Sequence, residues 1–127
     1  MEFYLEVISP EKVLISKQVS EVTVPAYEGD MTILAEHVNL VTFLRPGIMN
    51  EVSSSNQKRY FIEEGTVEFS RNKLLILTPS IIDVEKIDRS KISEQIKDLE
   101  NKVLSQKNSD KQNFLYSQKI ETLKNIT

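Results

Sequence analysis

The apolar residues of this chain follow two different periods, and the change near residue 88 limits the fold more than any other feature. Up to about residue 86 the period is two, since Phe3, Leu5 and Val7 alternate with more polar neighbours, as in a half-buried β-strand. Turn-forming residues interrupt this pattern about every eight to twelve positions. We therefore predict an antiparallel β-sandwich or flattened barrel of about nine or ten short strands over residues 1–86. Six aromatic residues fall in these strand segments and are expected to be mostly core: Phe3, Tyr4, Phe43, Tyr60, Phe61 and Phe69.

From Asp88 onward the period is helical, with two apolar stripes separated by a polar break near residue 109. Asp88 is suited to cap the first helix, and Ser109 with Gln112 has the spacing of a capping box for the second helix. These signals predict a C-terminal hairpin of two helices over residues 87–127, which makes the fold class α+β. The stripes consist of Ile92, Ile96, Leu99 and Val103 in the first helix and of Tyr116, Ile120 and Leu123 in the second.

The two predicted parts differ in charge and in how firmly they are expected to be held. Residues 88–127 contain eight basic and six acidic side chains, whereas residues 1–87 contain eight and thirteen. Short helices are marginally stable in water unless tertiary packing supports them, and each stripe here is narrow. We therefore expect a slightly basic, weakly held hairpin that can detach from an acidic sandwich.

Composition argues against several classes of function. The formal net charge is −3, so we expect no nucleic-acid partner, because such partners require a basic face. The chain has no cysteine, which excludes disulfides, thiolate zinc ligands and thiol nucleophiles. Residues 1–6 lack the basic and apolar regions of a signal peptide, and no segment has the ~18 apolar residues needed to cross a bilayer. We expect no direct membrane insertion, so that any membrane association goes through another protein.

The stretch over residues 25–37 holds the most distinctive polar residues of the chain. Glu28-Gly29-Asp30 is a turn signature, because glycine accepts a positive φ and aspartate bonds to its own backbone. Glu36 and the single histidine, His37, follow within a few positions. We interpret these three carboxylates and the imidazole as one projecting, acidic docking loop at the tip of the sheet.

Residues suited to catalysis are few. His37 could act as a base or a metal ligand, but a zinc site needs further nitrogen or sulfur ligands, and the chain has no second histidine and no cysteine. The three carboxylates of the loop could surround a hard cation, but they lack the spacing of a calcium loop. Glu63 and Glu64, if adjacent on a strand, point to opposite faces and cannot act on one atom, so we interpret them as a solvated edge. A surface or partner-contact histidine in a non-catalytic module is the preferred interpretation.

A series of short motifs occurs in a characteristic order along the chain. Leu5-Glu6-Val7-Ile8-Ser9-Pro10-Glu11 comes first, and Glu28-Gly29-Asp30-Met31 and His37 follow. Leu40 and Thr42, Arg45-Pro46-Gly47 and Gly65-Thr66-Val67-Glu68-Phe69 come next, before the helical hairpin. In this order and spacing the motifs resemble the epsilon subunit of the F-type ATP synthase. The resemblance spans nearly the whole chain and is strongest over residues 1–80.

The resemblance implies a non-catalytic rotor subunit of the central stalk, which links the gamma subunit to the c-ring loops in proton-driven ATP synthesis. It also implies a peripheral position in the complex at the cytoplasmic face of the bacterial inner membrane. In that family the acidic residue after the turn glycine and the following histidine face the c-ring and gamma. This implies such contacts for Asp30 and His37, with Thr42 near gamma, and the candidate contact set also includes Glu28 and Met31 beside Asp30.

In relatives the hairpin can extend toward the catalytic alpha/beta hexamer and block ATP hydrolysis, and some relatives bind ATP to hold it folded. The resemblance therefore implies this hexamer as a further partner. The ATP-holding pattern is Ile-Asp, two residues, then Arg-Ala, whereas here Ile87 and Asp88 are followed by Lys91 and Ile92 at the last two positions. Lysine is a poorer bidentate phosphate partner than arginine. We expect weak or no ATP binding and assign no cofactor.

Two other interpretations are open at this point. The sandwich could be a free-standing protein-binding module, in which case it needs no gamma partner. The chain could instead be a small hydrolase that uses His37 with Glu36 or Asp30. In that case, replacing His37 by alanine would abolish the activity.

Overall fold

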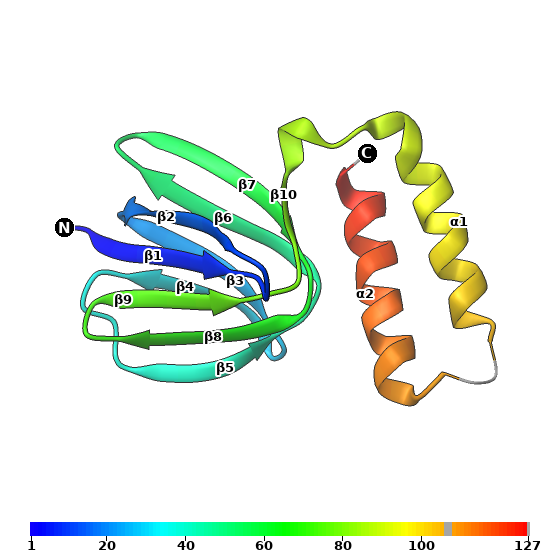
Figure 1. The fold of residues 1–127 in the computed structure, drawn as a ribbon, viewed down its shortest axis with the longest axis horizontal. Coiled ribbons are helices and arrows are strands. Elements are labelled where there is room, and N and C mark those ends of the chain that lie inside the picture. The colour runs from blue at the N-terminus through cyan, green and yellow to red at the C-terminus, as the bar shows by residue number, and fades with distance from the viewer. Residues whose placement is uncertain (106–107, 127) are drawn as a thin grey trace.

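The computed structural model describes residues 1–105 and 108–126, and it has the α+β architecture that the sequence predicts. Within these residues, ten strands form one sheet that folds over into a sandwich, and two helices stand beside one end of it (Figure 1). Two 3-10 helices, η1 (Val84–Lys86) and η2 (Arg89–Lys91), lead into α1 (Ile92–Val103) and α2 (Asp110–Ile126). The strands are β1 (Phe3–Ile8), β2 (Val13–Val19), β3 (Glu21–Ala26), β4 (Gly29–Leu34), β5 (Leu40–Leu44), β6 (Gly47–Ser53), β7 (Asn56–Ile62), β8 (Gly65–Ser70), β9 (Lys73–Leu77) and β10 (Ile81–Asp83).

The hydrogen-bonded order of the strands explains how one sheet makes two layers. The order is β10-β7-β6-β3-β5-β8-β9-β1-β2, and β4 pairs with β3 outside this path. The β3–β5 ladder consists of a single residue pair, Ala26 with Leu44, and the sheet folds over there. The β1–β9 ladder is parallel, unlike the other ladders and unlike the purely antiparallel sandwich predicted. It arises because the first strand inserts between β2 and the much later strand β9.

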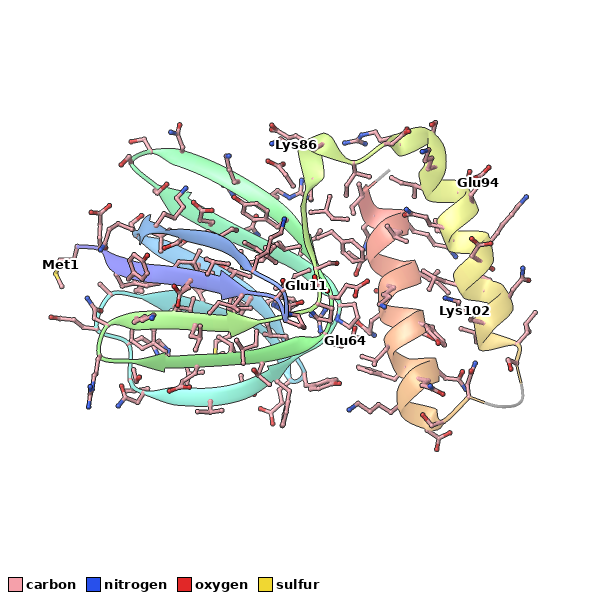
Figure 2. The ribbon with its side chains drawn as sticks, in the orientation of Figure 1. Met1, Glu11, Glu64, Lys86, Glu94 and Lys102 are labelled. Carbon is pink, nitrogen blue, oxygen red and sulfur yellow. The ribbon has the colours of Figure 1, made fainter. Side chains whose placement is uncertain are left out.

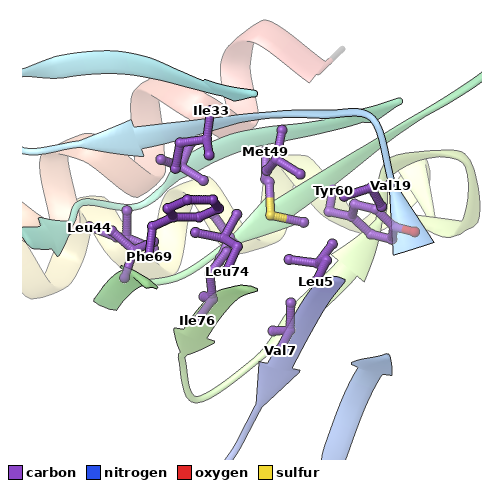
Figure 3. Packing of buried hydrophobic residues seen from close by; sticks show 14 of the residues in the cluster. Leu5, Val7, Val19, Ile33, Leu44, Met49, Tyr60, Phe69, Leu74 and Ile76 are labelled. Carbon is purple, nitrogen blue, oxygen red and sulfur yellow. The ribbon is translucent and has the colours of Figure 1, made fainter. Parts of the chain in front are cut away.

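The core lies between the two layers and follows the predicted alternation. Phe3, Leu5 and Val7 on β1 are at most 1% exposed, and the ring of Phe3 meets that of Phe69 edge to face at 5.6 Å. Figure 3 shows this packing of aliphatic side chains around Phe69. All fifteen buried members of this cluster come from residues 3–76, so the interior of the sandwich needs no helical residue to fill it.

A buried polar group joins the two layers on the side where β2 approaches β6. The Glu51 carboxylate is 1% exposed, forms an ion pair with Lys17 of β2, and accepts a hydrogen bond from the Tyr60 hydroxyl at 3.0 Å. Burial, and secondly the neighbouring Glu51 carboxylate, raise the pKa of Tyr60. Because a buried carboxylate without partners is costly, these bonds fix the relative position of three strands.

Two hairpin turns contain consecutive residues with positive φ, and one of them is tighter than the sequence predicts. The sequence favours a six-residue polar loop over residues 53–58, but β6 and β7 continue to a two-residue turn at Ser54 and Ser55, with φ of 47° and 71°. Arg71 and Asn72, between β8 and β9, also have positive φ, at 50° and 58°. Two consecutive positive φ values are typical of the type I′ turn, whose twist matches that of the flanking strands. Serine carries no preference for such a turn, so the sequence did not indicate it.

The helical hairpin has the predicted capping box. The Ser109 N–H donates to Oε1 of Gln112 at 2.9 Å, and the Gln112 N–H donates to Oγ of Ser109 at 3.1 Å. Asp88, predicted to cap the first α-helix, instead caps η2 by accepting from the Ser90 N–H, and α1 begins at Ile92. The stripes meet the sandwich rim in a second, smaller cluster whose buried members are Phe61, Val84, Ile92, Leu123 and Ile126.

Candidate contact surfaces

The acidic turn between β3 and β4 lies at the end of the sandwich that faces the helices (Figure 1). Its two turn residues are Tyr27 and Glu28, and Asp30 already belongs to β4. The Asp30 side chain is 63% exposed and accepts a hydrogen bond from Nη2 of Arg45 at 2.9 Å, while Glu28 is exposed. This surface is therefore accessible, but the charge of Asp30 is partly balanced by a cation of the same chain.

His37 lies beyond the opposite end of β4, so the prediction of a single docking loop is wrong. The β3–β4 ladder runs from Gly29 opposite Ala26 to Leu34 opposite Glu21. A strand rises about 3.3 Å per residue, so the six residues of β4 span roughly 20 Å. In Figure 1 the β4–β5 connection lies at the end of the sandwich away from the helices. The acidic turn and the histidine thus form two separate surfaces.

The His37 side chain is half-buried and is held from two sides. Its ring meets the ring of Phe69 edge to face at 5.9 Å, and Nδ1 lies 2.7 Å from the carbonyl oxygen of Val38. Its backbone N–H donates to the carbonyl of Leu34 at 3.2 Å. Within residues 1–105 and 108–126 no carboxylate is hydrogen-bonded to the imidazole, as a catalytic base oriented by Glu36 would require. The geometry fits a surface contact better than a proton-transfer site.

The other two candidate residues point inward, and their neighbours on β5 carry the exposed surface. Met31 and Thr42 are half-buried, and Met31 packs against the main core. Val41 and Phe43, in contrast, are 76% and 62% exposed, so the prediction that Phe43 belongs to the core is wrong. The sequence of β5 is apolar on both faces, and such a strand normally has both faces covered, so the local pattern alone does not indicate this exposure.

Phe43 belongs to a mostly apolar row of paired residues that crosses the outer face of the second layer. It lies opposite Thr66 on β8, which lies opposite Leu77 on β9. Leu77 pairs with Ile8 on β1, and Ile8 with Val13 on β2. Leu77 and Val13 are 46% and 53% exposed. Exposed apolar side chains on one face, here with Thr66 between Phe43 and Leu77, make this face a candidate protein-interaction surface.

A lysine on α2 joins the hairpin to the sandwich. Nζ of Lys119 lies 3.4 Å from Oε1 of Glu63 and 3.8 Å from Oε2 of Glu64, and the lysine side chain is only 16% exposed. The two glutamates lie in the connection between β7 and β8, so the predicted solvated strand edge is wrong. Figure 2 shows Glu64 at the end of the sandwich that faces α2.

One contact near the start of α2 adds to this seam, and another at its end closes the hairpin on itself. Near its start, the ring of Phe114 lies 5.5 Å from that of Tyr27, which lies 6.4 Å from the ring of Phe43. Near its end, Nη1 of Arg89 donates to the carbonyl of Ile126 at 2.8 Å, a favourable place for a cation at a helix C-terminus. The hairpin in this conformation is folded back against the sandwich.

The remnant of the ATP-holding pattern borders a cleft at the base of the hairpin. Ile87 packs against the second cluster, and the Asp88 carboxylate accepts from the N–H and hydroxyl of Ser90 at 3.0 and 2.6 Å. Lys91, Lys102 and Lys119 line the same cleft. Asp88 caps η2 and Lys119 pairs with two glutamates, so these two side chains of the cleft already have partners within the chain.

Neither a metal site nor a spanning helix is found in the described part of the chain. Over residues 1–105 and 108–126, no three or more histidine and carboxylate side chains gather closely enough to hold a metal ion. Over the same residues, no helix combines the length and apolarity needed to cross a membrane.

Comparison with known proteins identifies the family. The model of the β-sandwich domain of the ATP synthase delta/epsilon chain matches residues 2–84. An ATP synthase epsilon chain from Pelagibacter ubique is 42% identical over 126 residues, which are 98% of this chain and 97% of the relative. An ATP synthase epsilon chain 2 from Nitrobacter hamburgensis is 36% identical over 85% of this chain and 79% of the relative. The chain belongs to the ATP synthase delta/epsilon family, as an epsilon chain. It is a non-catalytic subunit, which removes the hydrolase alternative.

Solved structures share the same fold at lower identity. A chain of the Euglena gracilis mitochondrial ATP synthase, from a structure of OSCP, F1 and the c-ring, matches with a TM-score of 0.80 at 22% identity. The match covers 98% of this chain and 80% of that one. A chain from the central stalk and c-ring of the Tetrahymena thermophila mitochondrial ATP synthase matches with a TM-score of 0.70 at 14% identity, over 100% and 98% of the two chains.

Proposed function

We propose that this chain is the rotor subunit that links the gamma subunit to the c-ring in proton-driven ATP synthesis, at the cytoplasmic face of the bacterial inner membrane. The sandwich, residues 1–86, is the docking body, and residues 87–127 form a mobile regulatory hairpin. The observation that carries the proposal is the exposed, mostly apolar row that begins at Phe43 on the outer face of the sandwich. The choice of gamma and the c-ring as partners rests on membership in the epsilon family.

The gamma subunit covers the outer face of β5 and the loop before it. Val41 and Phe43 are the most exposed apolar side chains of that strand, and burying them in an interface recovers about 25 cal/mol for each Å² removed from water. His37 lies in the preceding loop and Thr42 on the same strand. Val41 and Phe43 give gamma an apolar centre and His37 a polar edge, the usual composition of a protein interface, while Thr42 lies behind them on the inward face of the strand.

The loops of the c-ring meet the other surface, at the β3–β4 turn. Glu28 and Asp30 are exposed there, and Met31 anchors the strand that carries them to the core. Since β4 separates this turn from His37, one small partner segment does not contact both surfaces, which supports two different partners. Each exposed ion pair contributes only about 0.2–1 kcal/mol, so docking on the ring rests on several contacts together.

A stiff body suits this role. A proton that crosses a potential of 100 mV releases about 2.3 kcal/mol, and the stalk must transmit the sum of several such steps. The packed interior of the sandwich and the ion pair between Lys17 and Glu51 resist deformation, because packed protein interiors have low compressibility.

The hairpin acts as a brake on ATP hydrolysis when it leaves the sandwich and reaches the alpha/beta hexamer. Support comes from its small contact with the sandwich, which consists of the second cluster, the Lys119 ion pairs and the Phe114 ring contact. ATP does not hold this hairpin folded, because Asp88 and Lys119 are engaged within the chain. Calorimetric titration of the isolated chain with ATP should detect weak or no binding. Tight, micromolar binding would contradict this.

Co-purification with gamma tests the proposed function directly. We expect the full chain and gamma to elute as one complex, and the double variant V41E/F43E to elute as separate proteins. Leu104, which is 78% exposed on the hairpin, supplies the matched control: Leu104→Glu should leave the complex intact. A chain that stays monomeric beside gamma, as a free-standing module does, would contradict the proposal.

Charge reversal at Asp30 tests the ring contact. Asp30→Lys should weaken assembly on the c-ring by about two- to fivefold, the range of one exposed ion pair, and the loss should be larger at low salt than at high salt. The variant also places a lysine beside Arg45 in place of their ion pair, so Arg45→Gln serves as the control for that local change. Equal assembly of both variants at all salt concentrations would remove Asp30 from the contact.

A further inference from the structure

Asn72, in the turn between β8 and β9, connects three segments that are distant in sequence. Its carbonyl oxygen accepts from the Tyr4 N–H at 3.2 Å, and its Nδ2 donates to the carbonyl of Glu2 at 3.1 Å. Its Oδ1 accepts from the backbone N–H of Glu36 at 2.8 Å. One residue therefore holds the N-terminal strand and the β4–β5 loop against the same turn.

The β4–β5 loop needs such support, because Glu36 has a φ of 64°. The left-handed region is unfavourable for a residue with a β-carbon, and such a conformation persists when surrounding contacts impose it. Inside the loop, the His37 N–H donates to Leu34 at 3.2 Å. The bond from Glu36 to Asn72 comes from outside the loop and fixes the residue just before the histidine.

The β8–β9 turn that carries Asn72 lies against the β4–β5 loop. The φ of Asn72, 58°, and that of Arg71, 50°, define the two-residue turn, and asparagine tolerates this region better than most residues. The turn follows Phe69, whose ring packs against His37. The same β8–β9 hairpin thus holds the loop by a hydrogen bond at Glu36 and by a ring contact at His37.

We propose that Asn72 is a positioning residue that fixes the β4–β5 loop in the conformation that gamma recognises. The held loop presents Val38, which is 75% exposed, directly after the half-buried His37. A loop ordered before docking loses less conformational freedom when the complex forms, and this increases affinity. The gamma partner rests on the proposed function, whereas the positioning of the loop does not.

Three variants distinguish the effect of the Asn72 side chain from the effect of the turn conformation. Asn72→Gly keeps the positive φ at no steric cost and removes both side-chain bonds. Asn72→Asp keeps an acceptor for the Glu36 N–H but no donor for Glu2. Arg71→Gly relaxes the other positive-φ position of the same turn, and the Arg71 side chain makes none of the bonds described above.

Amide hydrogen exchange at Glu36, measured by NMR on the full chain, reads the positioning without any partner. We expect Asn72→Gly to speed this exchange about fivefold, the factor that corresponds to one ordinary hydrogen bond. In Asn72→Asp and Arg71→Gly, the exchange rate at Glu36 should stay within about twofold of that of the parent chain. The first variant keeps a side-chain oxygen at position 72 as acceptor, and the second keeps Asn72 itself. Unchanged exchange in Asn72→Gly would overturn the proposal.

Affinity for gamma, measured with the same variants, tests what the positioning serves. Asn72→Gly should bind gamma about fivefold more weakly and Asn72→Asp should recover most of that loss. Faster exchange at Glu36 with unaltered gamma affinity would contradict the docking role of the held loop. If the parent chain itself does not bind gamma, the proposed function fails, and the exchange pattern still decides whether Asn72 positions the loop.

Discussion

The sandwich and the hairpin are stabilised in different ways. The sandwich encloses fifteen buried residues between its layers, hydrogen-bonded strands surround them, and a buried carboxylate joins three strands. The hairpin shares a cluster of five buried residues with the rim of the sandwich. Within the described residues its further links to the sandwich include a lysine between two glutamates and a ring contact.

From this difference we expect the hairpin to separate while the sandwich stays folded. No member of the main core is helical within the described residues, so detachment exposes the rim cluster and leaves the interior packed. Regions with few buried apolar contacts open at lower free energy than the global unfolding. The proposed function, in which the sandwich docks and the hairpin regulates, requires this combination of a rigid part and a loosely held part.

The largest effect is expected in the main core. Phe69→Ala removes a ring that is 1% exposed and packs against Phe3, and should lower the free energy of unfolding by about 3–5 kcal/mol. The hairpin offers the matched control, since Phe114 is 38% exposed and Phe114→Ala should cost less than about 1 kcal/mol of global stability. Urea unfolding followed by circular dichroism measures both. Equal losses would remove the contrast between the two regions.

A cavity in the rim cluster should loosen the hairpin alone. Leu123 is 3% exposed and packs in the second cluster, and Leu→Ala changes at buried sites cost about 2–5 kcal/mol. We expect Leu123→Ala to speed amide exchange throughout α1 and α2 while β1 and β9 keep their protection. Uniform loss of protection in the strands would mean that sandwich and hairpin unfold as one unit.

The stability of the sandwich should decline at high pH because of Tyr60. Its pKa is raised in the folded state by burial and by Glu51, so the folded chain keeps the phenol proton at a pH where the unfolded chain has lost it. The stabilisation is complete below the unfolded pKa of about 10 and is lost as pH rises through the folded pKa, with a slope of at most about 1.4 kcal/mol per pH unit. Tyr60→Phe should unfold with a shallower dependence on pH above 10. Identical slopes for the two proteins would contradict this.

The smallest effect is expected for the ion pairs of the seam. Lys119→Met keeps the aliphatic stem but removes the contacts to Glu63 and Glu64, and should favour the detached hairpin by about 1 kcal/mol, since the glutamates are partly exposed. Lys111, exposed on the first turn of α2, gives the control Lys111→Met. The amide exchange rates of α2 are measured at low and high salt in the parent chain and in both variants. Added salt should speed exchange in the parent chain and in Lys111→Met, but not in Lys119→Met. An equal salt response in Lys119→Met would exclude this ion pair as a link.

Patterns over a few neighbouring residues predict the strands and helices and their buried faces. Alternation in β1 and the helical stripes beginning at Ile92 specify which face is buried, and the capping box at Ser109 fixes the start of α2. These features depend on neighbours within a few residues. The turn at Ser54 and Ser55 was missed because its positive φ values are imposed by the flanking strands and not by the residues themselves.

The contact surfaces were harder to predict, because they depend on contacts between distant segments. Asp30 and His37 are seven positions apart, but an intervening strand places them at opposite ends of the sheet. Glu63 and Glu64 meet a lysine more than fifty residues later, which no local spacing indicates. The exposure of Phe43 could have been inferred from the two apolar faces of β5, had the sheet order been known.

Deletion of residues 88–127 tests most directly whether the sandwich is a self-sufficient docking body with a detachable brake. The shortened chain should unfold cooperatively and bind gamma within about threefold of the full chain, a change expected of a region outside the interface. The assembled enzyme should hydrolyse ATP faster than the enzyme with the full chain. An unfolded or non-binding fragment would contradict the self-sufficient sandwich, and unaltered hydrolysis would contradict the brake.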